Sequence, residues 1–104
     1  MNVADEFARA AVYYPGKKAL IFENRSFTYA EMHQIIERLA GYLIHLGILK
    51  GERVSLYMPN RPEWIMFYYA IARIGAITVC VPGAYKSSEM KHVVTDSLST
   101  FLVT

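Results

Sequence analysis

Two strand-to-helix junctions are the places where this sequence could bind a nucleotide. A phosphate cradle needs several glycines between a strand and a helix, because backbone amides must approach the phosphate oxygens. The first junction, MPNRPE (58–63), has no glycine, and the second, VPGAYKSSE (81–89), has only Gly83, with Lys86 and a pair of serines nearby. The second junction is therefore more typical of an ordinary turn followed by a helix cap.

Side chains that could hold a metal or act as a nucleophile are scattered along the chain. The three histidines, which we expect on three different segments, have no carboxylate or cysteine at metal-ligand spacing: His33, His45 and His92. The serines lack an evident nucleophile elbow or a neighbouring base: Ser55, Ser87, Ser88 and Ser97. The sequence therefore suggests no catalytic, cofactor-binding or metal-binding residue, and we expect the histidines at the surface or in helix caps.

A group of aromatic residues and a single cysteine complete the candidates. The aromatic group could form the wall of a ligand site, but its helical spacing is more typical of a core: Trp64, Phe67, Tyr68 and Tyr69. Cys80 lies between two valines, so we expect a small buried side chain with no disulfide or metal partner. One unpaired cysteine fits a reducing cytoplasm.

Length and composition limit the class of protein. The 104 residues suit one small domain, and with 54% hydrophobic and 19% charged residues the chain should fold around a core. Nucleic-acid binding is not predicted, because the net charge is only +2 and the basic residues alternate with acidic ones instead of forming a patch.

No export signal or membrane span is predicted either. The N-terminus lacks the basic and apolar regions of a secretory signal. Residues 64–81 contain a single charge, Arg73, and are just long enough to be considered as a span. A polar cap precedes them, however, Gly75 interrupts them, and their second half favours a strand.

The first residues predict a helix and a hairpin. Asn2 is a capping residue followed by two carboxylates, so a helix should run from there to about Tyr13. Short β-favouring runs at 19–22 and 26–28 then flank a turn. These signals predict a small hairpin, or at least a strand and a turn.

A long amphipathic helix follows the hairpin. Thr28 and Glu31 have the spacing of a capping box, so the helix should begin at Tyr29. Its apolar residues follow the period of 3.6 closely: Met32, Ile35, Ile36, Leu39, Ala40, Leu43 and Leu46. Gly47 provides a left-handed stop.

The second half predicts a βαβαβ unit with a parallel sheet. Strand 53–58, helix 61–74 and strand 77–81 form a crossover, with Gly75 ending the helix. A further helix, capped by Ser87 or Ser88, and a strand at 100–104 should follow. The chain is thus predicted to have an α/β fold in which a helix, a hairpin and a long helix precede βαβαβ.

The crossover helix has unusual features. Asn60 and Glu63 have capping-box spacing, and Pro62 lies in the first turn, where its missing amide hydrogen costs little. The helix is apolar almost all round, so it must be covered on more than one side. The following run, 77–81, reads as a strand of the kind buried in a parallel sheet.

Three motifs, in this order, resemble the beginning of the adenylate-forming superfamily, which includes acyl-CoA synthetases, luciferase-like ligases and peptide-synthetase adenylation domains. FTYAEM (27–32) resembles the first core motif, and ARIGAITVCVP (72–82) is similar to the second. Between them, LGILKGERVSLYMPNRPEW (46–64) matches the Leu-Gly, Lys-Gly-acid-Arg-Val and Pro-Asn pattern. Glu52 stands where aspartate is commoner, and Gly83-Ala84 replaces a usual polar pair, so the substrate class stays open.

The resemblance implies that residues 1–104 are a single partial domain, the N-terminal portion of an enzyme that activates a carboxylate with ATP and magnesium and often transfers it to coenzyme A. It also implies that the phosphate loop, the acyl pocket and the catalytic lysine come later than the second motif. On this reading no catalytic, cofactor or metal residue of the family lies on the chain, and its partner is the remainder of the enzyme.

Two other hypotheses remain open. The chain could be a catalytically silent interaction module that covers its apolar surface by self-association. It could also be a small flavodoxin-like ligand binder, a reading that depends on topology alone.

Overall fold

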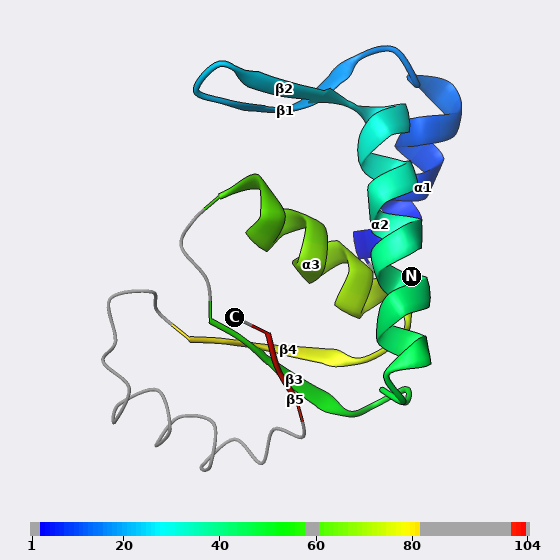
Figure 1. Cartoon of the computed structure of the whole chain (residues 1–104). Coiled ribbons are helices and arrows are strands. Elements are labelled where there is room, and N and C mark those ends of the chain that lie inside the picture. The colour runs from blue at the N-terminus through cyan, green and yellow to red at the C-terminus, as the bar shows by residue number, and fades with distance from the viewer. Residues whose placement is uncertain (1–2, 58–60, 82–100, 104) are drawn as a thin grey trace.

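A computed structural model describes residues 3–57, 61–81 and 101–103 and shows an α/β fold (Figure 1). Its helices are α1 (Val3–Tyr13), α2 (Tyr29–His45) and α3 (Pro62–Arg73). Its strands are β1 (Lys18–Phe22), β2 (Arg25–Thr28), β3 (Arg53–Leu56), β4 (Ile77–Cys80) and β5 (Phe101–Val103). The predicted order of these elements is confirmed, while the helix predicted after Ser87 or Ser88 lies outside the described residues.

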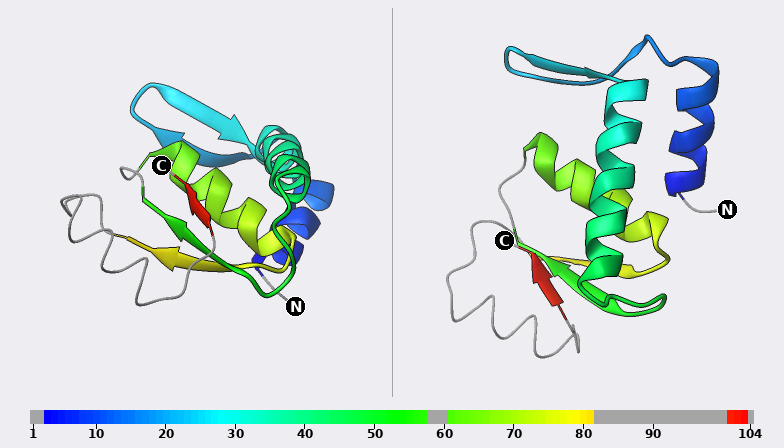
Figure 2. Two further views of the ribbon diagram at one scale, coloured as in Figure 1. Left: turned by 60° about the horizontal axis from the view of Figure 1, so that its bottom comes forward. Right: turned by 45° about the vertical axis from the view of Figure 1, so that its right-hand side comes forward.

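The strands form two sheets. Strands β1 and β2 pair antiparallel, with Phe22 opposite Arg25, so the hairpin loop consists of the two residues between them. The other sheet has three parallel strands in the order β4-β3-β5. Figures 1 and 2 show α3 between the hairpin and this sheet, with α2 crossing at one side.

Helix α2 begins and ends as its sequence predicts. The Oγ1 of Thr28 accepts a hydrogen bond from the backbone N–H of Glu31 at 3.1 Å, and the Glu31 Oε1 accepts one from the backbone N–H of Thr28 at 2.8 Å. This capping box satisfies two amides that lack partners within the helix. After the C-cap residue, Gly47 has a φ of 94°, which a side chain would resist.

Helix α3 begins one residue later than its capping signal predicts. Its N-cap is Arg61 instead of Asn60, and the Arg61 side chain makes no capping hydrogen bond. Pro62 takes the first helical position, where its fixed φ suits the helix and its missing N–H leaves nothing unpaired. Asn60 itself lies outside the described residues.

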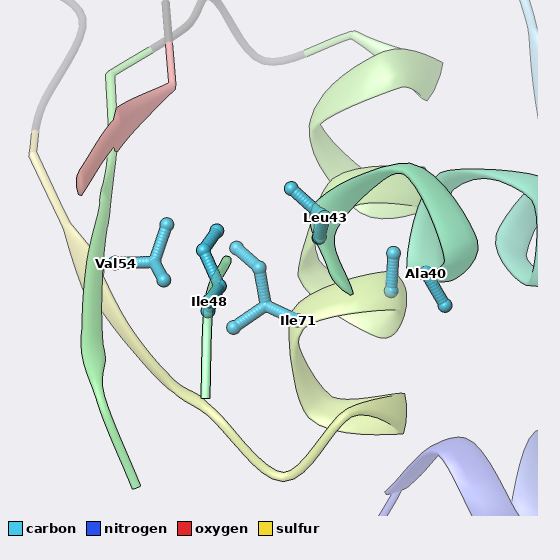
Figure 3. Close-up of a cluster of buried hydrophobic side chains, with 6 residues drawn as sticks. Ala40, Leu43, Ile48, Val54 and Ile71 are labelled. Atoms are coloured by element: carbon cyan, nitrogen blue, oxygen red, sulfur yellow. The ribbon is translucent and has the colours of Figure 1, made fainter. Parts of the chain in front are cut away.

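The core consists of two clusters that α3 joins. The first packs α2 and α3 onto β3, as Figure 3 shows, and contains Ala40, Leu43, Ile48, Val54, Ala70 and Ile71. The second lies between α2, α3, α1 and the hairpin and contains Met32, Ile36 and Met66. Arg73 is the one exposed residue of α3, which confirms that this apolar helix is covered on more than one side.

The burial expected for strand 77–81 is only partly observed. Within β4 the end residues Ile77 and Cys80 are exposed, whereas three consecutive residues of β3 are fully buried: Val54, Ser55 and Leu56. The reason is strand order, because β3 has a paired neighbour on each side while β4 has one in the described sheet. An apolar run indicates a parallel strand, but it does not show which strand is central.

Candidate functional site

The carboxyl ends of the parallel strands are the place where this fold could form a site. Helix α3 connects β3 to β4 on one side, and β5 pairs with β3 on the other side. Ligands of open α/β sheets bind outside the carboxyl ends of the strands. The strands that form this edge are held in register: the Val81 N–H donates to the Leu56 carbonyl at 3.1 Å.

The candidate residues of the two junctions are only partly described. Arg61 is exposed at the start of α3, and Pro62 is buried directly after it. The second junction, with Gly83, Lys86 and the serines at 87 and 88, lies outside the described residues. Of the two cations in these junctions, Arg61 and Lys86, only Arg61 is among the described residues.

Serine and cysteine candidates have contrasting environments on neighbouring strands. Ser55 is fully buried in the middle of β3, where a hydroxyl serves packing and hydrogen bonding instead of attacking a substrate. Cys80 is exposed at the end of β4, so the expectation of a buried thiol is wrong. Its two valine neighbours suggested burial, but β4 is the outer strand of the described sheet.

We expected the three histidines on three different segments, and this expectation is wrong for two of them. His33 and His45 both belong to α2, where twelve residues of helix separate them by about 18 Å. His45 is exposed in the last turn, a place expected for a cap histidine, whereas His33 is half-buried. His92 lies outside the described residues.

The described part of the chain contains no set of side chains that could bind a metal ion or a nucleotide phosphate. No group of three or more histidine, cysteine, aspartate or glutamate side chains that could hold a metal occurs within 3–57, 61–81 and 101–103. The donors that magnesium and ATP phosphates require, clustered carboxylates and a glycine-rich cradle, are not assembled by these residues. The described residues therefore do not fit magnesium or ATP.

The aromatic residues of α3 divide into two pairs. Phe67 packs against the first core cluster and Tyr69 against the second, which confirms the core reading for these two. Trp64 and Tyr68 are half-buried and stack on each other, with ring centroids 5.4 Å apart and planes 8° apart. Burial raises the pKa of the Tyr69 phenol, which also contacts the Phe7 ring at 4.9 Å.

Two ion pairs that the sequence reasoning missed connect α3 to other elements. The Arg25 Nη1 of the hairpin donates to the Glu63 Oε1 at 3.0 Å, at the first turn of α3. The Arg73 Nε donates to the Glu37 Oε1 of α2 at 2.9 Å, at the last turn. The partners are far apart in sequence, so no local spacing could have indicated either pair.

Within the part of the chain that the structure describes, the helices are too short or too polar to cross a bilayer.

Comparisons with known proteins agree on one family. The model of the AMP-binding enzyme family matches residues 7–104. A crotonobetaine/carnitine–CoA ligase of Salmonella typhi is 38% identical over 108 residues, covering 99% of this chain and 21% of that relative. The chain therefore spans about a fifth of the length of the curated relatives it matches.

Solved structures show the same relationship in three dimensions. The N-terminal subdomain of Klebsiella oxytoca NpsA superposes with a TM-score of 0.93 at 28% identity, covering 98% of this chain and 27% of that one. The N-terminal domain of FACL13 from Mycobacterium tuberculosis gives 0.91 at 31% identity, covering 97% and 26%. The chain belongs to the AMP-binding enzyme family, and it corresponds to part of the N-terminal subdomain of these adenylate-forming enzymes.

Proposed function

We propose that this chain is the N-terminal structural portion of an ATP-dependent acyl-CoA synthetase and that it carries no catalysis by itself. The enzyme would activate a carboxylate as an acyl-adenylate and then form a thioester with coenzyme A. The observation that supports this most is the 38% identity to a CoA ligase over 99% of the chain. ATP, magnesium and coenzyme A would be bound by residues beyond these 104, which form a single partial domain.

The described residues support a scaffold role. The first core cluster packs α2 and α3 against β3 of the parallel sheet. The side chains with catalytic potential are either buried, like Ser55, or dispersed, like the two histidines of α2. The partner in this proposal is the remainder of the enzyme. The compartment that fits it is the cytoplasm, where a lone thiol such as Cys80 stays reduced.

Thioester formation tests the proposal. The purified chain is incubated with ATP, magnesium, coenzyme A and a panel of short, long and aromatic carboxylic acids, and acyl-CoA is measured by mass spectrometry. We expect none above the blank, whereas a full-length CoA ligase assayed in parallel gives product. Acid-dependent thioester from the chain alone contradicts the proposal.

Self-association is the second candidate. Several large hydrophobic side chains are more than 45% exposed on the last turns of α2 and the loop after it: Tyr42, Ile44, Leu46 and Leu49. Such a surface favours a partner, and a second copy would serve. Light scattering of the purified chain distinguishes the two candidates, because a discrete dimer at low concentration supports a module and polydisperse aggregation supports the scaffold proposal.

A further inference from the structure

The β1–β2 hairpin is attached firmly at its base and lightly near its tip. At the base, Leu20 and Phe27 pack against the second core cluster. Toward the tip, Ile21 is 65% exposed, and Figures 1 and 2 show the loop projecting beyond α2 on the side of α3. A two-stranded hairpin is only marginally stable without support, so contacts near its tip decide how often it opens.

Arg25 supplies such a contact. It follows the hairpin loop directly, opposite Phe22, and its guanidinium carbon lies 5.2 Å from the centre of the Phe27 ring. From there its Nη1 donates to the Glu63 Oε1 of α3 at 3.0 Å. The guanidinium thus lies against an aromatic ring of its own strand and binds a carboxylate of another element.

Glu63 compensates for a weak helix start. The N-cap residue of α3, Arg61, provides no side-chain hydrogen bond, so the first turn lacks the usual cap. The Glu63 carboxylate, at the second helical position, accepts a hydrogen bond from its own backbone N–H and favours the positive end of the helix dipole. Arg25 binds the Oε1 of this carboxylate, while its Oε2 is buried without a hydrogen-bond partner among the described residues.

We propose that the Arg25–Glu63 pair is a latch through which the hairpin fixes the start of α3, so that the hairpin and the first turn of this helix open together. Helix α3 is the element that follows β3 along the chain. Opening of the latch would therefore loosen the described start of α3, where the Trp64 N–H donates to the Arg61 carbonyl. The inference depends on the geometry of these elements and not on the reaction proposed above.

Hydrogen exchange on the 104-residue chain tests the latch. The reporters are the Trp64 amide, which donates to the Arg61 carbonyl at 3.0 Å, and the ladder amides of β1 and β2. We expect Arg25→Gln and Glu63→Gln each to speed exchange of both reporters by about two- to fivefold, as loss of an exposed ion pair would. The effect of the double variant should be smaller than the sum of the two single effects, because both substitutions remove the same ion pair.

The matched control is the ion pair at the other end of the same helix. Arg73→Gln removes the 2.9 Å contact with Glu37 and should leave the Trp64 and hairpin amides unchanged. High salt offers a second measurement that needs no variant: about 1 M NaCl shortens the Debye length to about 3 Å, so it should speed both reporters in the natural chain and not in Arg25→Gln. A change confined to one reporter, additive effects in the double variant, or no response to salt would each overturn the latch.

Discussion

A Cβ atom placed on Gly75 would lie 2.9 Å from the Cγ of Lys50, so the turn after α3 and the loop before β3 touch at this point. The Gly51 N–H also donates to the Gly75 carbonyl at 2.9 Å. Gly75 itself has a φ of 80°, a backbone conformation that side chains rarely adopt. The contact lies directly before the paired starts of β3 and β4, where Arg53 lies opposite Ile77.

Gly75→Ala should therefore destabilise the chain by about 1–2 kcal/mol, mainly because of the left-handed backbone, since the Lys50 side chain can move aside. Urea denaturation followed by circular dichroism measures the change. The control is Gly41→Ala, an exposed position in α2 with open space around its Cβ, which should stabilise by about 0.5–1 kcal/mol. Equal effects at the two glycines would contradict this account.

Truncating two neighbouring residues of α2 to alanine should have very different effects on the free energy of unfolding. Leu43 is 1% exposed in the first core cluster, whereas Ile44 is 60% exposed. We expect Leu43→Ala to cost about 2–5 kcal/mol in the free energy of unfolding and Ile44→Ala less than about 0.5 kcal/mol. If the Ile44 variant lost as much stability as the Leu43 variant, Ile44 would have to be buried, as it would be in a dimer.

The contribution of the α2 capping box to the free energy of unfolding should be measurable by itself. Thr28→Ala removes the oxygen that accepts from the Glu31 N–H, and we expect a loss of about 1 kcal/mol in the free energy of unfolding. Thr28→Ser keeps the hydroxyl and should retain most of that stability. A serine variant as unstable as the alanine variant would show that the methyl group, and not the cap, is what matters.

The contribution of Glu63 should depend on pH. Its own backbone N–H and the Arg25 guanidinium, with a smaller contribution from the Arg61 charge, hold the pKa of this carboxyl below its ordinary value of 4.5. Because the folded-state pKa is lowered, its stabilisation is present above pH 4.5 and is lost as the pH falls through the folded-state pKa. The natural chain should therefore exceed Glu63→Gln in stability at neutral pH, and the difference should shrink in acid. A difference independent of pH would contradict the assignment.

Local signals explain why much of the fold could be predicted. Thr28 with Glu31 marks the start of α2, and both Gly47 and Gly75 have the left-handed backbone expected of helix stops. These features act within one or two turns, so a single stretch of sequence contains all the residues involved. The βαβ crossover is predictable for the same reason, because the spacing of its apolar residues changes from that of a strand to that of a helix and back.

Features that depend on distant residues could not be predicted in this way. Cys80 looked buried because its neighbours are apolar, but its exposure depends on the place of β4 in the strand order. The Arg25–Glu63 pair joins residues 38 positions apart, and the contact of Gly75 with Lys50 joins two separate turns. Such relationships follow from packing, which no local spacing encodes.

The same limit applies to the candidate site. The sequence correctly indicated that a helix follows the strand at 53–58, and the structure places Arg61 and Pro62 at the start of that helix. It did not indicate that Glu63 would be held by the hairpin. Whether a carboxylate meets a cation depends on how α2 orients the hairpin over α3, which is a property of the assembled core.

The central claim is that these residues form a scaffold and not an active site. ATP–pyrophosphate exchange tests this claim most directly, because it reports the adenylation half-reaction without coenzyme A. The purified chain is mixed with ATP, magnesium, labelled pyrophosphate and the panel of carboxylic acids, beside a full-length CoA ligase as positive control. The account predicts no acid-dependent label in ATP from the chain alone. Robust exchange that requires any one of the acids would contradict it.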